Sequence, residues 1–424
     1  MKITLPYGNT TLTFQLPDRN LLAILEPSDV PAVADPDAAV LAALRQSVGS
    51  PPLREMVAPG SRVLIVVDDF TRPTPVHRLL PPLLAELAPQ QNKLDVTILI
   101  AAGTHRPMTT REIQDKVGAD VAARYPVLNH DAFDDAQLVD VGRTKNGTPI
   151  TVNRLVMASD FVIGVSNVVP HGLAGWSGGA KIIQPGVCSA ETTNWTHALA
   201  MMSPVPHLGR LDNPLRVEVE EVVKRAKLHF TLNVVLNRQA EVVHVVAGHP
   251  LLAHRRAVEL SEPVWVIPVP AMPDIIVASS YPSDVDFWQG AKGLYACEPL
   301  IKRGGDIILA TPCPEGIAIE EHTATMRALK GLPSKVGRHE AARRGIRDLT
   351  AVNVAVFLAR MNELAWVSIY SDGLSDDDLA VLGCARARSV QDALEAALDR
   401  QGPNATVVVI THGGEVCPVL RANP

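Results

Sequence analysis

Short apolar runs that alternate with helical patterns constrain the fold of this chain more than any other feature. Three runs occupy residues 62–67, 94–102 and 161–165, and a pattern typical of a helix follows each of the first two. Continuous apolar runs of this length are typical of strands that are buried on both faces of a parallel sheet. The alternation therefore predicts an α/β fold.

The same alternation returns after residue 268, where Pro268 and Pro270 interrupt the chain. The expected strands of this second part occupy residues 275–279, 306–310, 366–369 and 405–410. We therefore expect two domains, each with a mostly parallel sheet flanked by helices, and the active site in the cleft between them. Residues 1–268 would form an N-terminal catalytic and cofactor-binding domain, and residues 269–424 a C-terminal α/β domain that closes over the site.

Three further expectations concern the ends of elements. An alternating pattern on either side of Gly8 predicts a hairpin of residues 2–5 and 11–16. A helix is expected over residues 249–261, where Pro263 would end it, and another over residues 286–301.

The composition excludes several classes of protein. Apolar residues make up 47% of the chain and charged residues 20%, as in ordinary globular proteins, and the net charge of −6 gives no reason to expect a nucleic-acid partner. No apolar run reaches the ~18 residues of a membrane helix, and the first residues lack the pattern of a signal peptide. The five scattered cysteines form no C-x-x-C pair, which favours a reducing, cytoplasmic location.

Polar side chains of the kinds used in catalysis follow the early strands. Asp69 and Arg72 come after the first strand, and Thr104 and His105 come after the second. Because ligands bind at the carboxyl ends of the strands in open α/β sheets, we expect the strand ends to converge on one site. Arg72 is placed to bind a carboxylate through two N–H groups, and Asp69 to orient Arg72 or a histidine.

The third strand leads into a loop over residues 169–187 that holds five glycines. Glycine lets the backbone approach a ligand closely, and the uncovered N–H groups can bind an anion. Lys181 follows Gly178 and Gly179, where an amine can face a bound phosphate or an electrophile. The loop matches neither G-x-G-x-x-G nor the Walker A motif, and the glycines alone are equally consistent with a solvated surface loop.

Three histidines, His105, His171 and His197, lie in or beside these motifs. Histidine is the commonest acid/base residue near neutral pH, although a single buried histidine is more often structural. Three of them beside Arg72 and Lys181 favour a functional site. The residues leave three functions open: an enzyme with histidine acid/bases, a zinc-dependent hydrolase or lyase, and a non-catalytic binder of nucleotides or carboxylates.

Five motifs are spread over nearly the whole chain: DDFTRPTP (68–75), GTHRPMT (103–109), PHGLAGWSGGAKIIQPGV (170–187), TTNWTHALA (192–200) and DFWQGAKG (286–293). Together and in this order, they resemble the lactate racemase family, whose members use a nickel-pincer nucleotide. No single motif is specific, but five that agree in order and spacing are.

The resemblance implies a two-domain α/β fold and a pyridinium dithio-dicarboxylate mononucleotide that holds nickel through two sulfurs and a ring carbon. It implies that Lys181 forms a covalent thioamide link to this cofactor and that His197 supplies the remaining nickel ligand. Thr104, Gly178 and Gly179 would lie near the cofactor phosphate.

The resemblance also implies a substrate site. His105 and His171 would be the two acid/bases, one for each face of the substrate. The groups that would hold the substrate carboxylate or the region around it are Arg72, Gln289 and Lys292, with Asp69 in support. Trp288, which precedes Gln289, would narrow the pocket beside the C2 substituent.

The implied activity is that of an isomerase, a racemase or epimerase that inverts C2 of a 2-hydroxy acid such as lactate or malate by reversible hydride transfer. The C–H bond at C2 has very low acidity, so a hydride-accepting cofactor offers an easier route than proton abstraction. The implied partners are the small substrate and the cofactor-biosynthesis enzymes, since this chain alone cannot assemble the cofactor.

Overall fold

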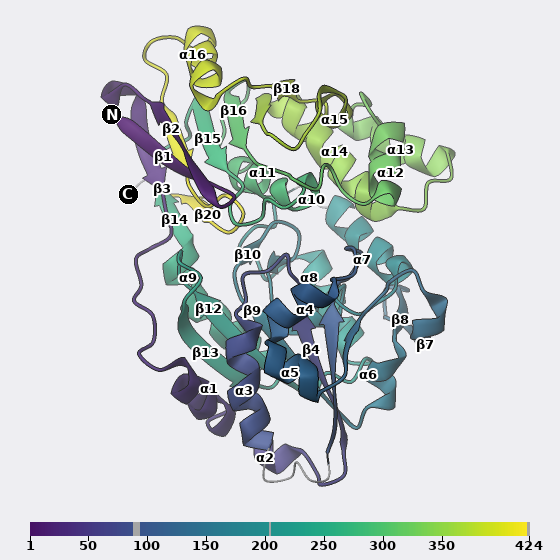
Figure 1. The fold of residues 1–424 in the computed structure, drawn as a ribbon. Helices are drawn as coiled ribbons and strands as arrows, with labels where there is room; N and C mark the ends of the chain where they lie inside the picture. The colour runs from purple at the N-terminus through teal and green to yellow at the C-terminus, as the bar shows by residue number, and fades with distance from the viewer. Residues whose placement is uncertain (88–93, 203–204, 422–424) are drawn as a thin grey trace.

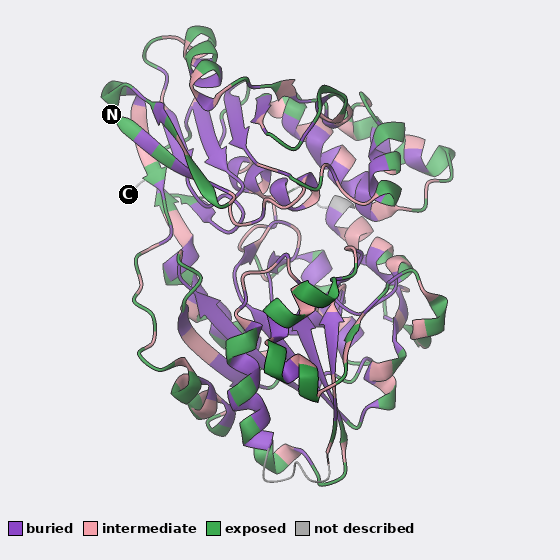
Figure 2. Cartoon of the chain, in the orientation of Figure 1, coloured by how far each residue is buried: buried purple, intermediate pink, exposed green. Residues whose placement is uncertain are grey.

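The computed structural model describes residues 1–87, 94–202 and 205–421, and it holds two six-stranded sheets in separate halves of the molecule (Figure 1). The strands of both sheets are largely buried, while the outer faces of many helices are exposed (Figure 2). The expected α/β architecture of two mostly parallel sheets flanked by helices is confirmed. No helix within the described ranges is long and apolar enough to cross a bilayer.

The first sheet has the order β13-β12-β9-β4-β5-β6, and every pair of neighbours is parallel except β12 and β13. Its strands are β4 (Arg62–Asp68), β5 (Asp95–Ala101), β6 (Val127–Asn129), β9 (Phe161–Asn167), β12 (Phe230–Leu236) and β13 (Val242–Gly248). The central strands β4, β5 and β9 match the three apolar runs, so the sequence pattern identified the core of this half correctly.

Helices cover both faces of the first sheet. Val63, Ile65 and Val67 of β4 pack against α1 (Pro36–Arg45), α2 (Leu53–Met56), α3 (Val76–Leu87), α4 (Thr110–Val117) and α5 (Ala119–Arg124). Leu64 and Val66 pack on the opposite side, with α6 (Arg154–Ala158) and α8 (Pro214–Val223). The other elements of this half are α7 (Ala190–Met202), α9 (Leu252–Trp265) and the antiparallel pair β7 (Leu138–Arg143) and β8 (Pro149–Asn153).

The second sheet has the order β18-β17-β16-β15-β19-β3 and is parallel throughout. Its strands are β3 (Leu21–Leu25), β15 (Ile275–Ser279), β16 (Asp306–Ala310), β17 (Trp366–Tyr370), β18 (Ala385–Arg386) and β19 (Val407–Ile410). The helices of this half are α10 (Phe287–Gly290), α11 (Lys292–Cys297), α12 (Glu320–Ala328), α13 (Ser334–Arg343), α14 (Leu349–Leu364), α15 (Asp376–Leu382) and α16 (Val390–Gln401).

The start of the chain belongs with the second sheet. The hairpin of β1 (Lys2–Tyr7) and β2 (Thr10–Gln15), which was expected, packs with α16 on one face of this sheet. β3 was not expected, and it pairs with β19, so residues 1–25 lie beside the second half in Figure 1. If each sheet defines one domain, residues 1–25 belong to the second domain and not to the expected range 1–268. The two domain ranges remain a prediction.

Three other element ends differ from the expectation. α9 runs through Pro263 to Trp265, whose buried indole donates a hydrogen bond to the carbonyl of Leu236 and anchors the last turn. Pro268 lies in β14 (Val266–Val269), which pairs with β20 (Cys417–Leu420). The expected helix 286–301 is divided into α10 and α11, because Gly290 and Gly293 are weak helix formers that pack tightly against the second sheet.

Candidate functional site

A pocket of about 1050 Å³, its open mouth included, lies where the carboxyl ends of β4, β5 and β9 face α7, α10, α11 and α14. The expected site residues that line it are Asp69, Arg72, Thr104, His105, His171, Gly178, Lys181, His197, Trp288, Gln289 and Lys292. Side chains from both halves of the molecule therefore meet in one cavity.

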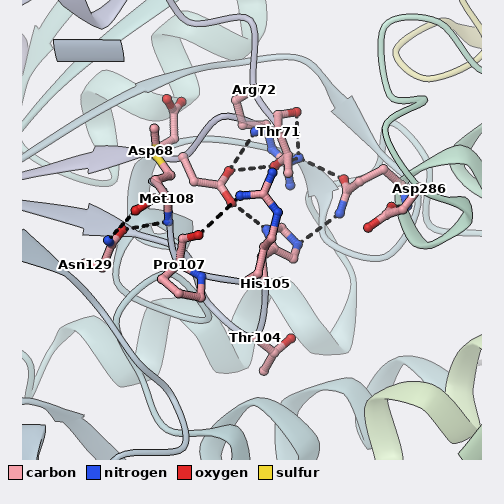
Figure 3. A network of polar contacts seen from close by, with 12 residues as sticks. Asp68, Thr71, Arg72, Thr104, His105, Pro107, Met108, Asn129 and Asp286 are labelled. Atoms are coloured by element: carbon pink, nitrogen blue, oxygen red, sulfur yellow. Dashed lines mark hydrogen bonds and ion pairs between the residues drawn. The ribbon is translucent and has the colours of Figure 1, made fainter. Parts of the chain in front are cut away.

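His105 is held between the two halves by its ring nitrogens. Its Nδ1 lies 2.7 Å from Oδ2 of Asp69, and its Nε2 lies 2.9 Å from Nε2 of Gln289. The amide nitrogen of Gln289 can only donate, so Nε2 of His105 accepts and Nδ1–H donates to Asp69. The lone pair of His105 Nε2 is therefore occupied by Gln289, and Figure 3 shows the polar network around the ring.

The loop after β4 fixes Asp69 in place. Oδ1 of Asp69 accepts from the backbone N–H of Thr71 at 3.2 Å and from its hydroxyl at 2.6 Å. Burial alone would raise the pKa of Asp69, but the charge and hydrogen bond of His105 hold that pKa below its usual value. The neighbouring Asp68 forms an ion pair with Lys116 at 2.8 Å, and Lys116 also bonds the carbonyl of Arg72. These contacts orient the whole strand end.

Two cations line the pocket without a carboxylate partner. Nη1 of Arg72 donates to Oε1 of Gln289 at 2.9 Å, and Nζ of Lys292 donates to Oγ of Ser283 at 3.3 Å. Within the described residues neither side chain forms an ion pair. Desolvation, and then the charge of Arg72, holds the pKa of Lys292 well below its usual value. The pair can receive a carboxylate from a ligand.

The first part of the glycine-rich loop forms a short hairpin. β10 (Pro170–His171) pairs with β11 (Gly175–Trp176), and the buried guanidinium of Arg216 donates to the carbonyls of Ala174 and Trp176. Gly175 has φ +74°, and a Cβ there would lie 1.7 Å from the carbonyl oxygen of Arg210. The hairpin needs glycine at this position because no side chain fits.

The two expected functional groups of this loop are in contact. Nε2 of His171 lies 3.1 Å from Nζ of Lys181. Desolvation first, and then neighbouring cations, hold the pKa of both groups well below their usual values. Both side chains line the same pocket as His105.

His197 presents one free nitrogen to the pocket. Its Nδ1 lies 2.9 Å from the carbonyl oxygen of Thr193, one turn earlier on α7, so Nδ1 carries the proton and Nε2 is left as an acceptor. Desolvation lowers the pKa of His197 to about 4. Metal-ligating histidines are usually oriented in this way by a carbonyl on the other nitrogen.

The residues of the pocket fit a cofactor that itself supplies most of the ligands of its metal ion. Among the described residues no group of three or more histidine, cysteine, aspartate or glutamate side chains could hold a metal ion. The buried hydroxyls of Ser166 and Thr193 line the pocket and have no hydrogen-bond partner. Buried polar groups are normally satisfied, and a bound polar ligand would satisfy these two.

The paired glycines have different surroundings. Gly178 lines the pocket with φ +73°, and a Cβ there would lie 2.9 Å from the carbonyl of Asn167. Gly179 is not among the lining residues, since it packs against His254 and its N–H donates to Asn233. A contact of Gly179 with the cofactor stays a prediction.

Several lining residues were not expected from the sequence. Ser166 directly follows the apolar run 161–165, and Thr193 lies one turn before His197, so the strand-end rule and helical spacing could have found both. Outside the pocket wall, His322 stacks on Trp288 and lies 3.3 Å from the hydroxyl of Thr104. No sequence motif marks His322.

Two family models match the chain. The lactate racemase N-terminal domain matches residues 7–209, and the lactate racemase C-terminal domain matches residues 269–417. A lactate racemase from Thermoanaerobacterium thermosaccharolyticum is 32% identical over 74% of this chain and 75% of the relative. A lactate racemase from Lactiplantibacillus plantarum is 27% identical over 97% of this chain and 98% of the relative.

Solved structures agree with the matches to the lactate racemase family. The lactate racemase apoprotein from T. thermosaccharolyticum superposes with a TM-score of 0.88 at 28% identity, covering 100% of both chains. A protein from Thermotoga maritima shares the fold with a TM-score of 0.73 at 22% identity, over 91% of this chain and 98% of that one. This chain belongs to the lactate racemase family.

Proposed function

We propose that the protein is a racemase or epimerase that inverts C2 of a 2-hydroxy acid by reversible hydride transfer to a nickel-pincer nucleotide. The kinship with two lactate racemases supports the racemase class of isomerase. The observation that carries the mechanism is the meeting of His105, His171, Arg72 and Lys292 in one cavity. Lactate, malate and related acids are the candidate substrates.

The substrate carboxylate binds the two unpaired cations. Arg72 offers two N–H groups in a plane, and Lys292 adds a second positive charge from the other half of the molecule. Gln289 holds Arg72 through its Oε1 while its amide nitrogen contacts His105. The carboxylate is thereby placed next to the base, with Asp69 fixing the other side of His105.

The two histidines move the hydroxyl proton. In the structure the lone pair on Nε2 of His105 accepts from Gln289, and it would take the hydroxyl proton of one enantiomer in place of that contact. His171 presents its Nε2 to the same cavity and would return a proton on the opposite face. After inversion the two histidines have exchanged roles, which is what the reverse reaction requires.

The cofactor would be held by Lys181 through a thioamide and by Nε2 of His197 at nickel. When bound, it supplies the electrophile that takes the hydride from C2 and gives it back. Ser166 and Thr193 would donate their free hydroxyls to it, and Thr104 and Gly178 would lie nearby. The chain depends on cofactor-biosynthesis enzymes for this group.

Mass spectrometry and metal analysis test the proposal. Protein produced together with the cofactor-building enzymes should carry an adduct on Lys181, contain nickel and racemise a 2-hydroxy acid, whereas protein produced alone should be inactive. Zinc without an adduct would favour the hydrolase or lyase alternative. Anion binding with neither metal nor adduct would favour a non-catalytic binder.

A further inference from the structure

The hydrogen bonds of His171 decide where its proton lies. Nδ1 accepts from the backbone N–H groups of Leu173 and Ala174, each at 3.2 Å. A ring nitrogen that accepts a hydrogen bond carries no proton, so the single proton of the neutral ring lies on Nε2.

This proton fixes the state of Lys181. Nε2–H of His171 points at Nζ, 3.1 Å away, and a donor requires an acceptor on the other side. An ammonium group has three donors and no lone pair, so Nζ must be a neutral amine. The opposite arrangement, with an ammonium donating to Nε2, would place Nδ1–H against two N–H donors.

We propose that His171 has a role before it meets a substrate: its Nε2–H donates a hydrogen bond to the lone pair of Lys181, which keeps that amine uncharged until the cofactor is attached. The proposal rests on the proposed function, because it takes Lys181 as the attachment point. In this state His171 is a positioning residue for Lys181.

The surroundings act in the same direction. Desolvation first, and then the neighbouring basic groups of Arg72, Arg216 and Lys292, hold the pKa of Lys181 well below that of a free lysine. The carboxylates that line the pocket are engaged elsewhere, Asp68 with Lys116 and Asp69 with His105. His197 also influences His171, which has a strongly lowered pKa of its own.

The hairpin keeps the donors of Nδ1 in place. β10 and β11 pair on either side of Leu173 and Ala174, and Arg216 binds the carbonyls of Ala174 and Trp176. A ring with its proton on Nδ1 would lose the two hydrogen bonds from the N–H groups of Leu173 and Ala174.

Attachment would release His171 from this task. A thioamide nitrogen has a delocalised lone pair and accepts no hydrogen bond, so Nε2–H loses its acceptor once Lys181 is modified. His171 is then free to exchange a proton with the substrate. The acid/base role of His171 would follow loading rather than precede it.

Nitrogen-15 NMR of the histidines in unloaded protein tests the proton position directly. His171→Gln assigns the signals by their loss. We expect Nε2 to be protonated and Nδ1 unprotonated from pH 6.5 to 9. A protonated Nδ1 with a bare Nε2 would overturn the proposal.

Reductive methylation of unloaded protein, read by mass spectrometry, tests Lys181. The rate at an exposed lysine such as Lys330 should rise about tenfold per pH unit between pH 7 and 9, since only its neutral fraction reacts. The methylation rate at Lys181 should be independent of pH. Lower accessibility of Lys181 to the reagent would lower the rate at every pH but would not remove its pH dependence. A slope at Lys181 equal to that at Lys330 would reject the proposal.

Two variants complete the test. His105→Gln removes a histidine from the same cavity without touching Lys181, and the flat profile should remain. His171→Glu gives Lys181 an anionic partner, and its rate should then rise with pH. Neither measurement depends on enzyme turnover. If the methylation rate at Lys181 is independent of pH but the protein never receives an adduct, this inference stands and the proposed function is rejected.

Discussion

The indole of Trp288 lies flat on the imidazole of His322, with 4.1 Å between the ring centroids and 5° between the planes. Nδ1 of His322 lies 2.7 Å from Asp348, so its Nε2 accepts from the hydroxyl of Thr104. Trp288, which forms one wall of the pocket, is thereby held in place by His322 and Asp348 of the second half.

The first prediction concerns this wall. His322→Ala should raise KM roughly 2- to 10-fold, because an aromatic pair contributes about 0.5–1.5 kcal/mol, while kcat should change little. His322→Phe keeps a stacked ring and should keep KM near its original value. Steady-state kinetics of loaded protein check this, and equal KM values for the two variants would contradict a role for stacking.

Arg72→Lys should weaken substrate binding although the charge is kept, since lysine cannot make the planar two-donor contact with a carboxylate. We expect KM to rise about tenfold, the loss of one good charge-assisted hydrogen bond. Arg111→Lys is the control, because Arg111 is exposed on α4 and pairs with Asp115 outside the pocket. An unchanged KM in the Arg72 variant would place Arg72 outside the substrate site.

His105→Ala and His171→Ala should each abolish full racemisation in both directions. Each loaded variant should still perform the half-reaction that uses its remaining histidine as base, so one enantiomer should change the cofactor spectrum and the other should not. The loss for the missing base is roughly 10²–10⁴-fold. Rapid mixing with pure enantiomers measures this, and identical responses of both variants would rule out a two-base mechanism.

Lys181→Ala and His197→Ala should separate attachment from metal binding. The first variant should show no covalent adduct, because no other amine lies in the glycine-rich loop. The second should keep the adduct but lose nickel, since attachment does not use the imidazole. Intact-mass spectra and metal analysis of co-produced protein decide both; full nickel content in His197→Ala would remove it from the ligands.

Acid should destabilise the protein through His130. This side chain is 1% exposed, and desolvation lowers its pKa from 6.5 to about 4. Between these values the unfolded chain binds a proton that the folded one does not, so the free energy of unfolding falls as the pH drops from 6.5 to 4. The effect is on the order of 3 kcal/mol.

Denaturant unfolding at several pH values measures that fall. His130→Gln should flatten the acid side of the profile, whereas His339→Gln, at an exposed position, should leave the profile unchanged. Equal profiles for the two variants would assign the acid sensitivity to other groups, such as His254.

Local patterns revealed most of the first sheet and the contents of the pocket. The apolar runs before Asp69, Thr104 and Ser166 mark buried strands, and the rule that ligands bind at strand ends brought their loops together. β3 (Leu21–Leu25) was missed because it is only partly buried and its partner β19 lies at the other end of the chain.

The second half of the pocket depends on tertiary packing and was less visible. His322, which Asp348 holds through its Nδ1, contacts Thr104 only because the two halves are packed together. The division between α10 and α11 depends on close contacts of Gly290 and Gly293 with the sheet beneath them. Neither set of contacts produces a periodic pattern in the sequence from which it could be predicted.

The pairing of β3 with β19 has a consequence for biosynthesis. All strands of the first sheet lie between residues 62 and 248, so this half can fold while the ribosome is still extending the chain. β3 is synthesised before the other strands of the second sheet, but its partner β19 is complete only when Ile410 has been added. A nascent chain therefore carries Arg72, His105 and Lys181 on a half whose strands are all present before Gln289 and Lys292 have been synthesised.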